Sequence, residues 1–138
     1  MGNFFPHEYK VIDFQEGDMF AVPYSNGKFF ISRILKIDKI DIAEGDSISI
    51  MGSEFTATED DDLLIVSVTF SKPDFDSVEE ARNAAKNRTW ETQIAHIPKR
   101  TPGIAEGTYI GKQPVEQNEL KGYYCWKESF EKGEAGIW

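Results

Sequence analysis

The chain has 138 residues, and its 24 Asp and Glu residues outnumber its 15 Lys and Arg residues, which gives a net charge of −9. This length predicts one domain, residues 1–138, that buries roughly two-thirds of its unfolded surface. The acidity argues against nucleic acid as a partner, because affinity for phosphate backbones comes mainly from Lys and Arg. No apolar run approaches the roughly 18 residues of a membrane span and no signal peptide is visible, so we expect a cytoplasmic protein.

The excess of acidic residues lies entirely in residues 1–76, where 15 Asp and Glu residues face 6 Lys and Arg residues, whereas residues 77–138 are balanced. Opposite potentials speed association, so a charged partner of this protein is expected to be basic. The alternative is that moderate acidity only keeps the protein soluble.

The first half of the chain predicts a hairpin. Residues 1–8 are expected to form an arm whose Phe residues pack back on the body, and residues 9–14 alternate as a first strand. Residues 19–22 then form a short apolar strand and residues 28–40 a long one. Asn26-Gly27 between them predicts a tight type I′ turn, because this pair supplies the two positive-φ positions that the turn demands.

One charged residue interrupts the apolar face of the long strand. The alternating apolar residues on that face are Phe29, Ile31, Leu35 and Ile37. Arg33 lies among them, so either its stem covers the core while the guanidinium reaches water, or it pairs with a buried carboxylate such as Asp18. A structural role is favoured over ligand binding.

The tripeptide Glu-Gly-Asp occurs twice, at residues 16–18 and 44–46, and each copy precedes a β-like segment, the second being residues 47–51. Gly17 allows an unusual φ, and Asp18 is expected to accept hydrogen bonds from backbone amides two residues on. We expect the same turn chemistry at both places rather than a true sequence repeat.

Four consecutive acids, Glu59, Asp60, Asp61 and Asp62, precede an almost continuous apolar run at residues 63–70. The run predicts a central strand buried on both faces. The acids are expected to form a solvated loop that guards the strand from edge pairing or that contacts a basic partner. A metal site is disfavoured, because consecutive strand residues would not all point inward and the spacing of a calcium loop is absent.

The second half predicts one helix and several short strands. Ser77 and Glu80 form a capping box for a surface helix over residues 77–88, with acids in its first turn and bases in its last. Strands are expected at residues 90–97, 107–115 and 122–126, with a loop at 98–103 and a loosely packed tail at 128–138 that Ile137 and Trp138 pin. The fold class is therefore α+β and mainly β, a strongly bent antiparallel sheet or an SH3-like barrel with one surface helix.

Few residues indicate catalysis. His96 and Cys125 could form a thiol–imidazole pair. Cys125 lies between Tyr124 and Trp126, however, where a small buried thiol that fills the core is commoner. No cofactor motif is present, and a single Cys agrees with a reducing compartment. Some aromatic residues could instead line an interface, although most of them are expected to be core residues: Tyr24, Tyr123, Trp126 and Trp138.

Residues 16–35 resemble the opening of the immunity protein 26 family of bacterial polymorphic toxin systems. The family pattern is Gly-Asp, an apolar strand ending in Pro, a Gly-centred turn, and an aromatic strand that closes on Arg and two aliphatics. Residues 109–115 are similar to its late segment, an aromatic residue, an aliphatic-Gly pair and a Pro-aliphatic pair. Ser32 departs from the family, which tends to carry Gly before the Arg. The matching residues with an expected structural role are Gly17, Asp18, Pro23, Gly27, Arg33, Gly111 and Pro114.

The resemblance implies an intracellular, non-enzymatic protein that binds and neutralises one cognate toxin. With the acidic first half, it favours a basic toxin, such as a nuclease, that is occluded by the bound protein. Two alternatives stay open: a small β-barrel adaptor that recognises a peptide or a modified side chain, and an enzyme that uses Cys125 or His96. The oligomeric state is left open. The candidate toxin contacts are Glu59, Asp60, Asp61, Asp62, Asp74 and Asp76.

Overall fold

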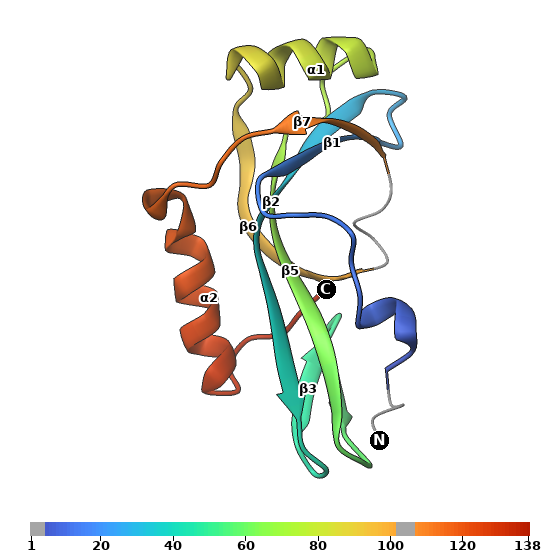
Figure 1. Cartoon of the computed structure of the whole chain (residues 1–138), viewed down its shortest axis with the longest axis vertical. Coiled ribbons are helices and arrows are strands. Elements are labelled where there is room, and N and C mark those ends of the chain that lie inside the picture. Colours follow the sequence, from blue (N-terminus) through green and yellow to red (C-terminus); the bar gives the residue numbers. More distant parts are fainter. Residues whose placement is uncertain (1–4, 102–106) are drawn as a thin grey trace.

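The computed structural model describes residues 5–101 and 107–138 and confirms a mainly β, α+β fold. Its main body is an open, five-stranded antiparallel sheet in the order β6-β5-β2-β1-β7 (Figure 1). The strands are β1 (Asp18–Pro23), β2 (Phe29–Ile42), β5 (Asp61–Ser71), β6 (Thr92–Arg100) and β7 (Thr108–Lys112). A separate two-stranded sheet pairs β3 (Ser47–Ile50) with β4 (Ser53–Thr56). The helical elements are η1 (His7–Tyr9), α1 (Val78–Asn87), η3 (Gln117–Leu120) and α2 (Lys121–Glu131).

The predicted hairpin is confirmed, since β1 and β2 pair from Met19 with Arg33 to Pro23 with Phe29. The predicted type I′ turn is wrong, because Gly27 has φ +81° while Asn26 does not have a positive φ. The amide of Gly27 donates to the carbonyl of Tyr24, and the amide of Tyr24 donates to Lys28, which makes a wider loop. A two-residue connection with positive φ at both positions occurs instead between β3 and β4, at Met51-Gly52.

A β-bulge in β2 between Ile34 and Lys36 changes which residues share a face. Before the bulge, Ile31, Arg33 and Leu35 point to one side of the sheet. After it, Ile37 packs in the same cluster as Ile34, on the opposite side. The predicted single face from Phe29 to Ile37 is therefore wrong beyond Leu35, because a bulge shifts the period-2 alternation by one residue.

Strand β5 is confirmed as a central strand, and it begins earlier than predicted. Asp61 and Asp62 belong to it and pair with Ile42 and Asp41 of β2. The solvated-loop prediction is wrong for these two residues. The side chain of Asp61 is fully buried and is held by Lys10 Nζ at 2.5 Å and by the backbone amide of Phe5 at 2.6 Å.

Helix α1 is confirmed. The amide of Glu80 donates to Ser77 Oγ at 3.1 Å, as an N-cap requires. The carboxylate of Glu80 accepts from the amide of Asp76 rather than from that of Ser77, so the reciprocal half of the predicted capping box is shifted by one residue. Ala81 and Ala85 are buried against the sheet, which explains the small side chains of this helix.

Helix α2 corrects two predictions, the single helix and the strand at residues 122–126. The residues that meet the sheet, Tyr123, Trp126 and Phe130, follow a spacing of three and four, which places them on one helical face. The tail is also more regular than predicted, because α2 continues to Glu131.

Both ends of the chain tie the two sheets together. Ile137 is buried and forms a parallel bridge with Ile50, which confirms the predicted pinning of the tail. The backbone of Trp138 pairs with Pro98 and Arg100 of β6. At the other end, Phe5 is buried in the same cluster as Ile137, as predicted for the arm. The first four residues of that arm, and residues 102–103 of the predicted loop at 98–103, lie outside the described residues.

Two further segment predictions need correction. Residues 9–14 form no strand, because the chain turns at η1 and then lays Ile12 and Phe14 against the cluster around Phe20 and Ile34. The predicted loop at 98–103 is wrong for residues 98–100, because β6 continues to Arg100 along Ile65. Among the described residues, no helix reaches the length and apolarity that a membrane span requires.

The two helices cover the same face of the sheet. Helix α1 packs over Ile31 with Ala81 and Ala85, and α2 packs over Leu35 with Tyr123. Figure 1 shows α1 across the end of the sheet near the β1–β2 loop, and α2 along the side of β6. Arg33 lies between Ile31 and Leu35 in the strand, and therefore in the space between the two helices.

Candidate functional site

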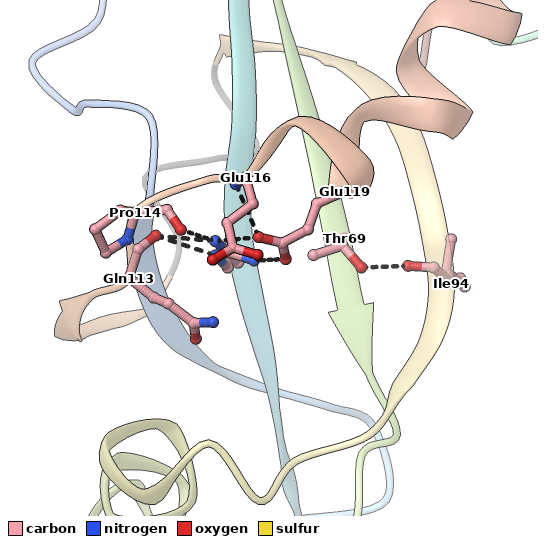
Figure 2. Close-up of polar contacts among 7 residues, drawn as sticks. Thr69, Ile94, Gln113, Pro114, Glu116 and Glu119 are labelled. Atoms are coloured by element: carbon pink, nitrogen blue, oxygen red, sulfur yellow. Dashed lines mark hydrogen bonds and ion pairs between the residues drawn. The ribbon is translucent and has the colours of Figure 1, made fainter.

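Arg33 is fully buried, and within the described residues its guanidinium donates hydrogen bonds to the segment between β7 and α2. Nη1 and Nη2 both meet the carboxylate of Glu119, the second at 3.1 Å. Nη2 also donates to the carbonyl of Pro114 at 2.7 Å, and Nη2 and Nε donate to the carbonyl of Gln113 (Figure 2). The predicted partner of Arg33, Asp18, instead accepts from the amide of Gln15 at 2.9 Å.

Glu119 is held in place from two directions. The hydrogen bond from Arg33 lowers the pKa of Glu119 more than any other contact, and its partial burial opposes this only in part. Its Oε1 also accepts from the amide of Glu116 at 3.0 Å, in a capping box that begins η3. A two-point pair with a carboxylate is the geometry that suits a guanidinium best. The pair therefore fixes where η3 and α2 start relative to β2.

The residues that resemble the family pattern fall into two groups. Four of them lie around the fifth, Arg33: the carbonyl of Gly17 accepts from the amide of Gln113, Asp18 follows Gly17 in the chain, Gly111 pairs with Met19, and the carbonyl of Pro114 accepts from Arg33. A Cβ at Gly17, which has φ +95°, would stand 2.7 Å from the carbonyl oxygen of Gln113. Pro23 and Gly27 lie at the hairpin end instead.

The two Glu-Gly-Asp tripeptides share the same turn. Asp18 Oδ2 accepts from the amide of Gln15, and Asp46 Oδ2 accepts from the amide of Ala43, each at 2.9 Å. The central glycines have φ +95° and +91°. The prediction of one turn used twice is confirmed, but the predicted donor is wrong, because each Asp accepts from the amide three residues before it and not from one two residues after it.

A cavity of about 410 Å³, called here the interhelical cavity, opens beside Arg33 between the end of α1 and the start of α2. Leu35 and Thr69 form its floor on the sheet. Figure 2 shows the hydroxyl of Thr69 donating to the carbonyl of Ile94, at 2.8 Å, which holds β6 to β5 where that pairing is irregular. The remaining wall residues are Arg88, Trp90, Thr92, Ala95, Gln113, Asn118, Glu119, Lys121 and Gly122.

A second concavity, of about 290 Å³, lies on the opposite face of the sheet and is called here the aromatic groove. Phe30 and Phe70 meet edge to face with ring centroids 5.0 Å apart, and Tyr24 meets Phe30 in the same way at 6.1 Å. Tyr24 is 52% exposed and Ile94 is 42% exposed. Exposed apolar surface gathered in one concavity is typical of a site that meets another molecule.

The candidate acids lie at two separate places. Asp74 and Asp76 are exposed in the loop after β5, next to Pro73, which lines the aromatic groove. Asp76 also pairs with Lys28 at 2.6 Å, and this hydrogen bond is the main cause of the raised pKa of Lys28. The hairpin end of the molecule therefore combines aromatic side chains with exposed acids.

The other four candidate acids lie at the opposite end of β5. The 11 residues of this strand, at roughly 3.3 Å per residue, separate the two places by about 35 Å. Asp61 is buried on Lys10, Asp62 pairs with Lys39 at 2.9 Å, and Asp60 accepts from the amide of Glu44 at 3.0 Å. Burial of Asp61 raises its pKa, and hydrogen bonds from Lys10 and two backbone amides together outweigh that effect, so the pKa lies below its usual value.

The four acids from Glu59 to Asp62 differ in exposure and do not form one exposed acidic surface. Asp61 has no exposed side-chain surface with which to contact a partner. Asp60 is exposed and Glu59 is half-buried. Within residues 5–101 and 107–138, no group of three or more His, Cys, Asp or Glu side chains is placed to hold a metal ion.

His96 and Cys125 have different surroundings. His96 Nε2 lies 2.8 Å from the hydroxyl of Ser67, and its ring packs against Tyr123 and Trp126. Burial lowers the pKa of His96 to about 4, so its imidazole is neutral near pH 7. Cys125 is exposed on α2, which corrects the expectation of a buried thiol.

Of the four aromatic residues considered for an interface, Tyr24, Trp138 and part of Trp126 are accessible, and Tyr123 is buried. The hydroxyl of Tyr123 donates to Asp38 at 2.6 Å, and burial, followed by this bond, raises its pKa well above the usual value. Trp126 donates to the carbonyl of Gly136 at 2.8 Å, so it supports the tail.

Sequence reasoning missed Glu119 and most of the aromatic groove. Glu116 and Glu119 have the spacing of a capping box, which could have indicated a helical start near residue 117. Phe30 is paired with Val22 in the β1–β2 ladder, and Phe70 is paired with Ser32 in the β2–β5 ladder. Only the register of β2 against β5 brings the two rings together.

No protein-family model, no curated protein and no solved structure matches the chain.

Proposed function

We propose that this protein is a cytoplasmic immunity protein that binds a basic toxin domain and blocks its active surface. The observation that carries the proposal is the aromatic groove with its exposed acids. The resemblance to an immunity family suggests toxin binding, and the groove provides a surface for that contact. Exposed Tyr24 and Ile94 stand at its edge, and Phe30 and Phe70 form its base.

Aromatic and aliphatic anchors in a concavity, surrounded by charged residues, are what stable protein interfaces use for most of their affinity. An interface of ordinary size buries about 800 Å² on each partner, which is more than the groove itself offers. The surrounding loop with Asp74 and Asp76 would therefore be part of the contact. The Asp74 carboxylate would speed encounter with a basic surface, whereas Asp76 is paired with Lys28 and would contribute less.

The position of the groove also favours inhibition in which the bound protein covers the active surface of the toxin. It lies on the face of the sheet opposite the two helices, next to the β1–β2 loop that projects beyond the strands (Figure 1). A partner seated there would meet a base built on three paired strands, β2, β5 and β6, while Tyr24 and Pro73 of the groove come from the adjoining loops. Rigid binding surfaces lose little entropy on association.

The experiment is co-purification with the product of the gene next to its own. Wild type is compared with Tyr24→Ala and Ile94→Ala, and the control is Tyr124→Ala, which removes a ring of similar exposure, 47%, from α2. We expect each groove substitution to weaken binding by roughly tenfold or more and the control to leave binding unchanged. A complex that forms equally well with all variants would contradict the groove as the binding face.

A second candidate function is an adaptor that holds a short peptide, and the chain of edge-to-face rings from Tyr24 to Phe70 is the observation that favours it. Such rings can hold an extended apolar or Pro-rich segment. The two functions differ in one measurable way. An adaptor binds an isolated peptide of about ten residues, whereas occlusion requires the folded toxin domain.

A further inference from the structure

The interhelical cavity carries a charge opposite to that of the molecule. The chain has a net charge of −9, yet three cationic side chains and one carboxylate line this cavity. Arg33 and Glu119 pair with each other there, so their charges cancel locally. The charge that remains belongs to Arg88 and Lys121.

Neither Arg88 nor Lys121 lies within ion-pair distance of an acidic group among the described residues, although Arg88 is near enough to Glu119 to help lower the pKa of that carboxylate. Both side chains are exposed, one at the end of α1 and the other at the start of α2, and both line the same cavity. Two unpaired cations that face one cavity attract an anion into it. In a protein with this excess of acid, an isolated cationic cavity indicates a bound anion better than it indicates a solubilising surface.

The backbone conformation of Arg88 is unusual for a residue other than Gly. Arg88 ends α1 in the left-handed region, with φ 54° and ψ 42°, a position at which Gly is by far the commonest residue. An Arg at this position bears a backbone strain that Gly would avoid. An Arg here complements the macrodipole at the end of α1, and it also places a guanidinium at the wall of the interhelical cavity.

Two other wall residues indicate what else the bound molecule carries. Trp90 is half-buried and provides an aromatic surface. Gln113 Oε1 is buried and, among the described residues, has no hydrogen-bond donor. Figure 2 shows the Gln113 side chain directed away from Glu119. A buried acceptor without a donor is uncommon and is satisfied when a ligand supplies an N–H or O–H group.

We propose that the interhelical cavity binds a small organic anion. Its phosphate or carboxylate lies between Arg88 and Lys121, its flat ring lies against Trp90, and one of its N–H or O–H groups donates to Gln113 Oε1. Nucleoside monophosphates and ring-bearing carboxylates both have this chemistry. A volume of about 410 Å³ lies in the usual range for small-molecule sites.

This site is independent of the proposed toxin contact. Thr92 and Ala95 of β6 line the interhelical cavity, whereas Gln93 and Ile94 line the aromatic groove. The two concavities therefore lie on opposite faces of the sheet, and each can be changed without touching the other. Loss of one function in the variants below is not expected to affect the other.

The test is calorimetric titration at low salt with AMP, GMP, indole-carboxylate and inorganic phosphate. The cavity variant combines Arg88→Gly, which also relieves the backbone strain, with Lys121→Gln. The control combines Lys86→Gln with Lys132→Gln, which removes the same charge from exposed positions outside the cavity. Removal of two charge-assisted hydrogen bonds is expected to weaken binding by about 100-fold, and the control by less than about twofold.

The outcomes separate the possible sources of the ligand. Binding of AMP and GMP but not of indole-carboxylate would support the proposal with a phosphate ligand, and the reverse would support it with a carboxylate. Inorganic phosphate that binds as tightly as the nucleotides would overturn it, because the ring would then contribute nothing. Absence of binding for every compound at about 1 mM, or equal binding by the cavity variant, would also overturn it.

Discussion

The guanidinium of Arg33 and the carboxylate of Glu119, 86 positions apart in the sequence, form a two-point ion pair inside the molecule. Arg33 comes from the central strand β2, and Glu119 comes from η3, just before α2. The same guanidinium donates hydrogen bonds to the carbonyls of Gln113 and Pro114. This one side chain therefore anchors the whole connection from β7 to α2 on the sheet.

The first prediction concerns the energetic coupling of this pair. Glu119→Ala leaves the Arg33 charge buried without its counter-ion, so we expect the free energy of unfolding to fall by about 3 kcal/mol. In an Arg33→Met background the same Glu119→Ala substitution is expected to lower it by less than about 1 kcal/mol. Urea denaturation of the four proteins measures the difference. Glu128→Ala, which breaks an exposed pair with Lys132, is the control and should change stability by no more than about 0.5 kcal/mol.

The second prediction is an acid-sensitive step that depends on Glu119. The pKa of Glu119 is lower in the folded protein than the ordinary value of 4.5, chiefly because Arg33 binds its carboxylate. The unfolded chain therefore takes up the proton first, and the contribution to stability, complete above about pH 4.5, is lost as the pH falls through the lower folded-state pKa. Glu119→Gln should show a flatter stability curve below pH 4.5. A curve parallel to that of wild type would contradict the prediction.

The third prediction concerns His96 in a higher pH window. Burial lowers the pKa of His96 from 6.5 to about 4, so the folded protein resists protonation that the unfolded chain accepts. Stability is then complete above about pH 6.5 and decreases as the pH falls from 6.5 to about 4. NMR titration of the imidazole should give a midpoint near 4. His96→Gln, which keeps a hydrogen-bonding group beside Ser67, should lose the pH dependence in this window. A midpoint near 6.5 would show that the ring is solvated.

The fourth prediction uses the two Glu-Gly-Asp turns as a matched pair. Gly17 and Gly45 have nearly equal positive φ, but a Cβ at Gly17 meets the carbonyl of Gln113 at 2.7 Å, whereas a Cβ at Gly45 meets open space. Gly45→Ala should lower the free energy of unfolding by about 1 kcal/mol through φ alone. Gly17→Ala should lower it by about 2 kcal/mol more, because the backbone must also move. Equal losses by thermal or urea denaturation would contradict a steric role for Gly17.

Much of the sheet could be predicted because its signals are local. The Asn26-Gly27 turn between two apolar runs located the hairpin, and the β-branched run before Phe70 located β5, which pairs on both sides. The turn type was wrong because Asn26 keeps a negative φ in a wider loop. Helix α2 was missed because its aromatic residues have high strand propensity, although Tyr123, Trp126 and Phe130 already followed a helical spacing.

The candidate sites depend on information that is not local. The bulge between Ile34 and Lys36 reverses the faces of β2, and no pattern around these residues predicts it. The partner of Arg33 could not be found among many carboxylates, because Glu119 meets it only through the tertiary fold. The acidic run was expected to be a solvated loop because four consecutive like charges need water or a cation around them. Asp61 is instead buried in β5, where Lys10 supplies the cation.

The most direct test of the proposed function is growth of cells that express the product of the neighbouring gene together with this protein. Wild type and Tyr124→Ala should restore growth, whereas a double variant, Tyr24→Ala with Ile94→Asp, should fail although it folds normally by circular dichroism. The result that would contradict the account is full rescue by the double variant, which would exclude the groove, or no rescue and no complex with wild type, which would exclude immunity to that protein.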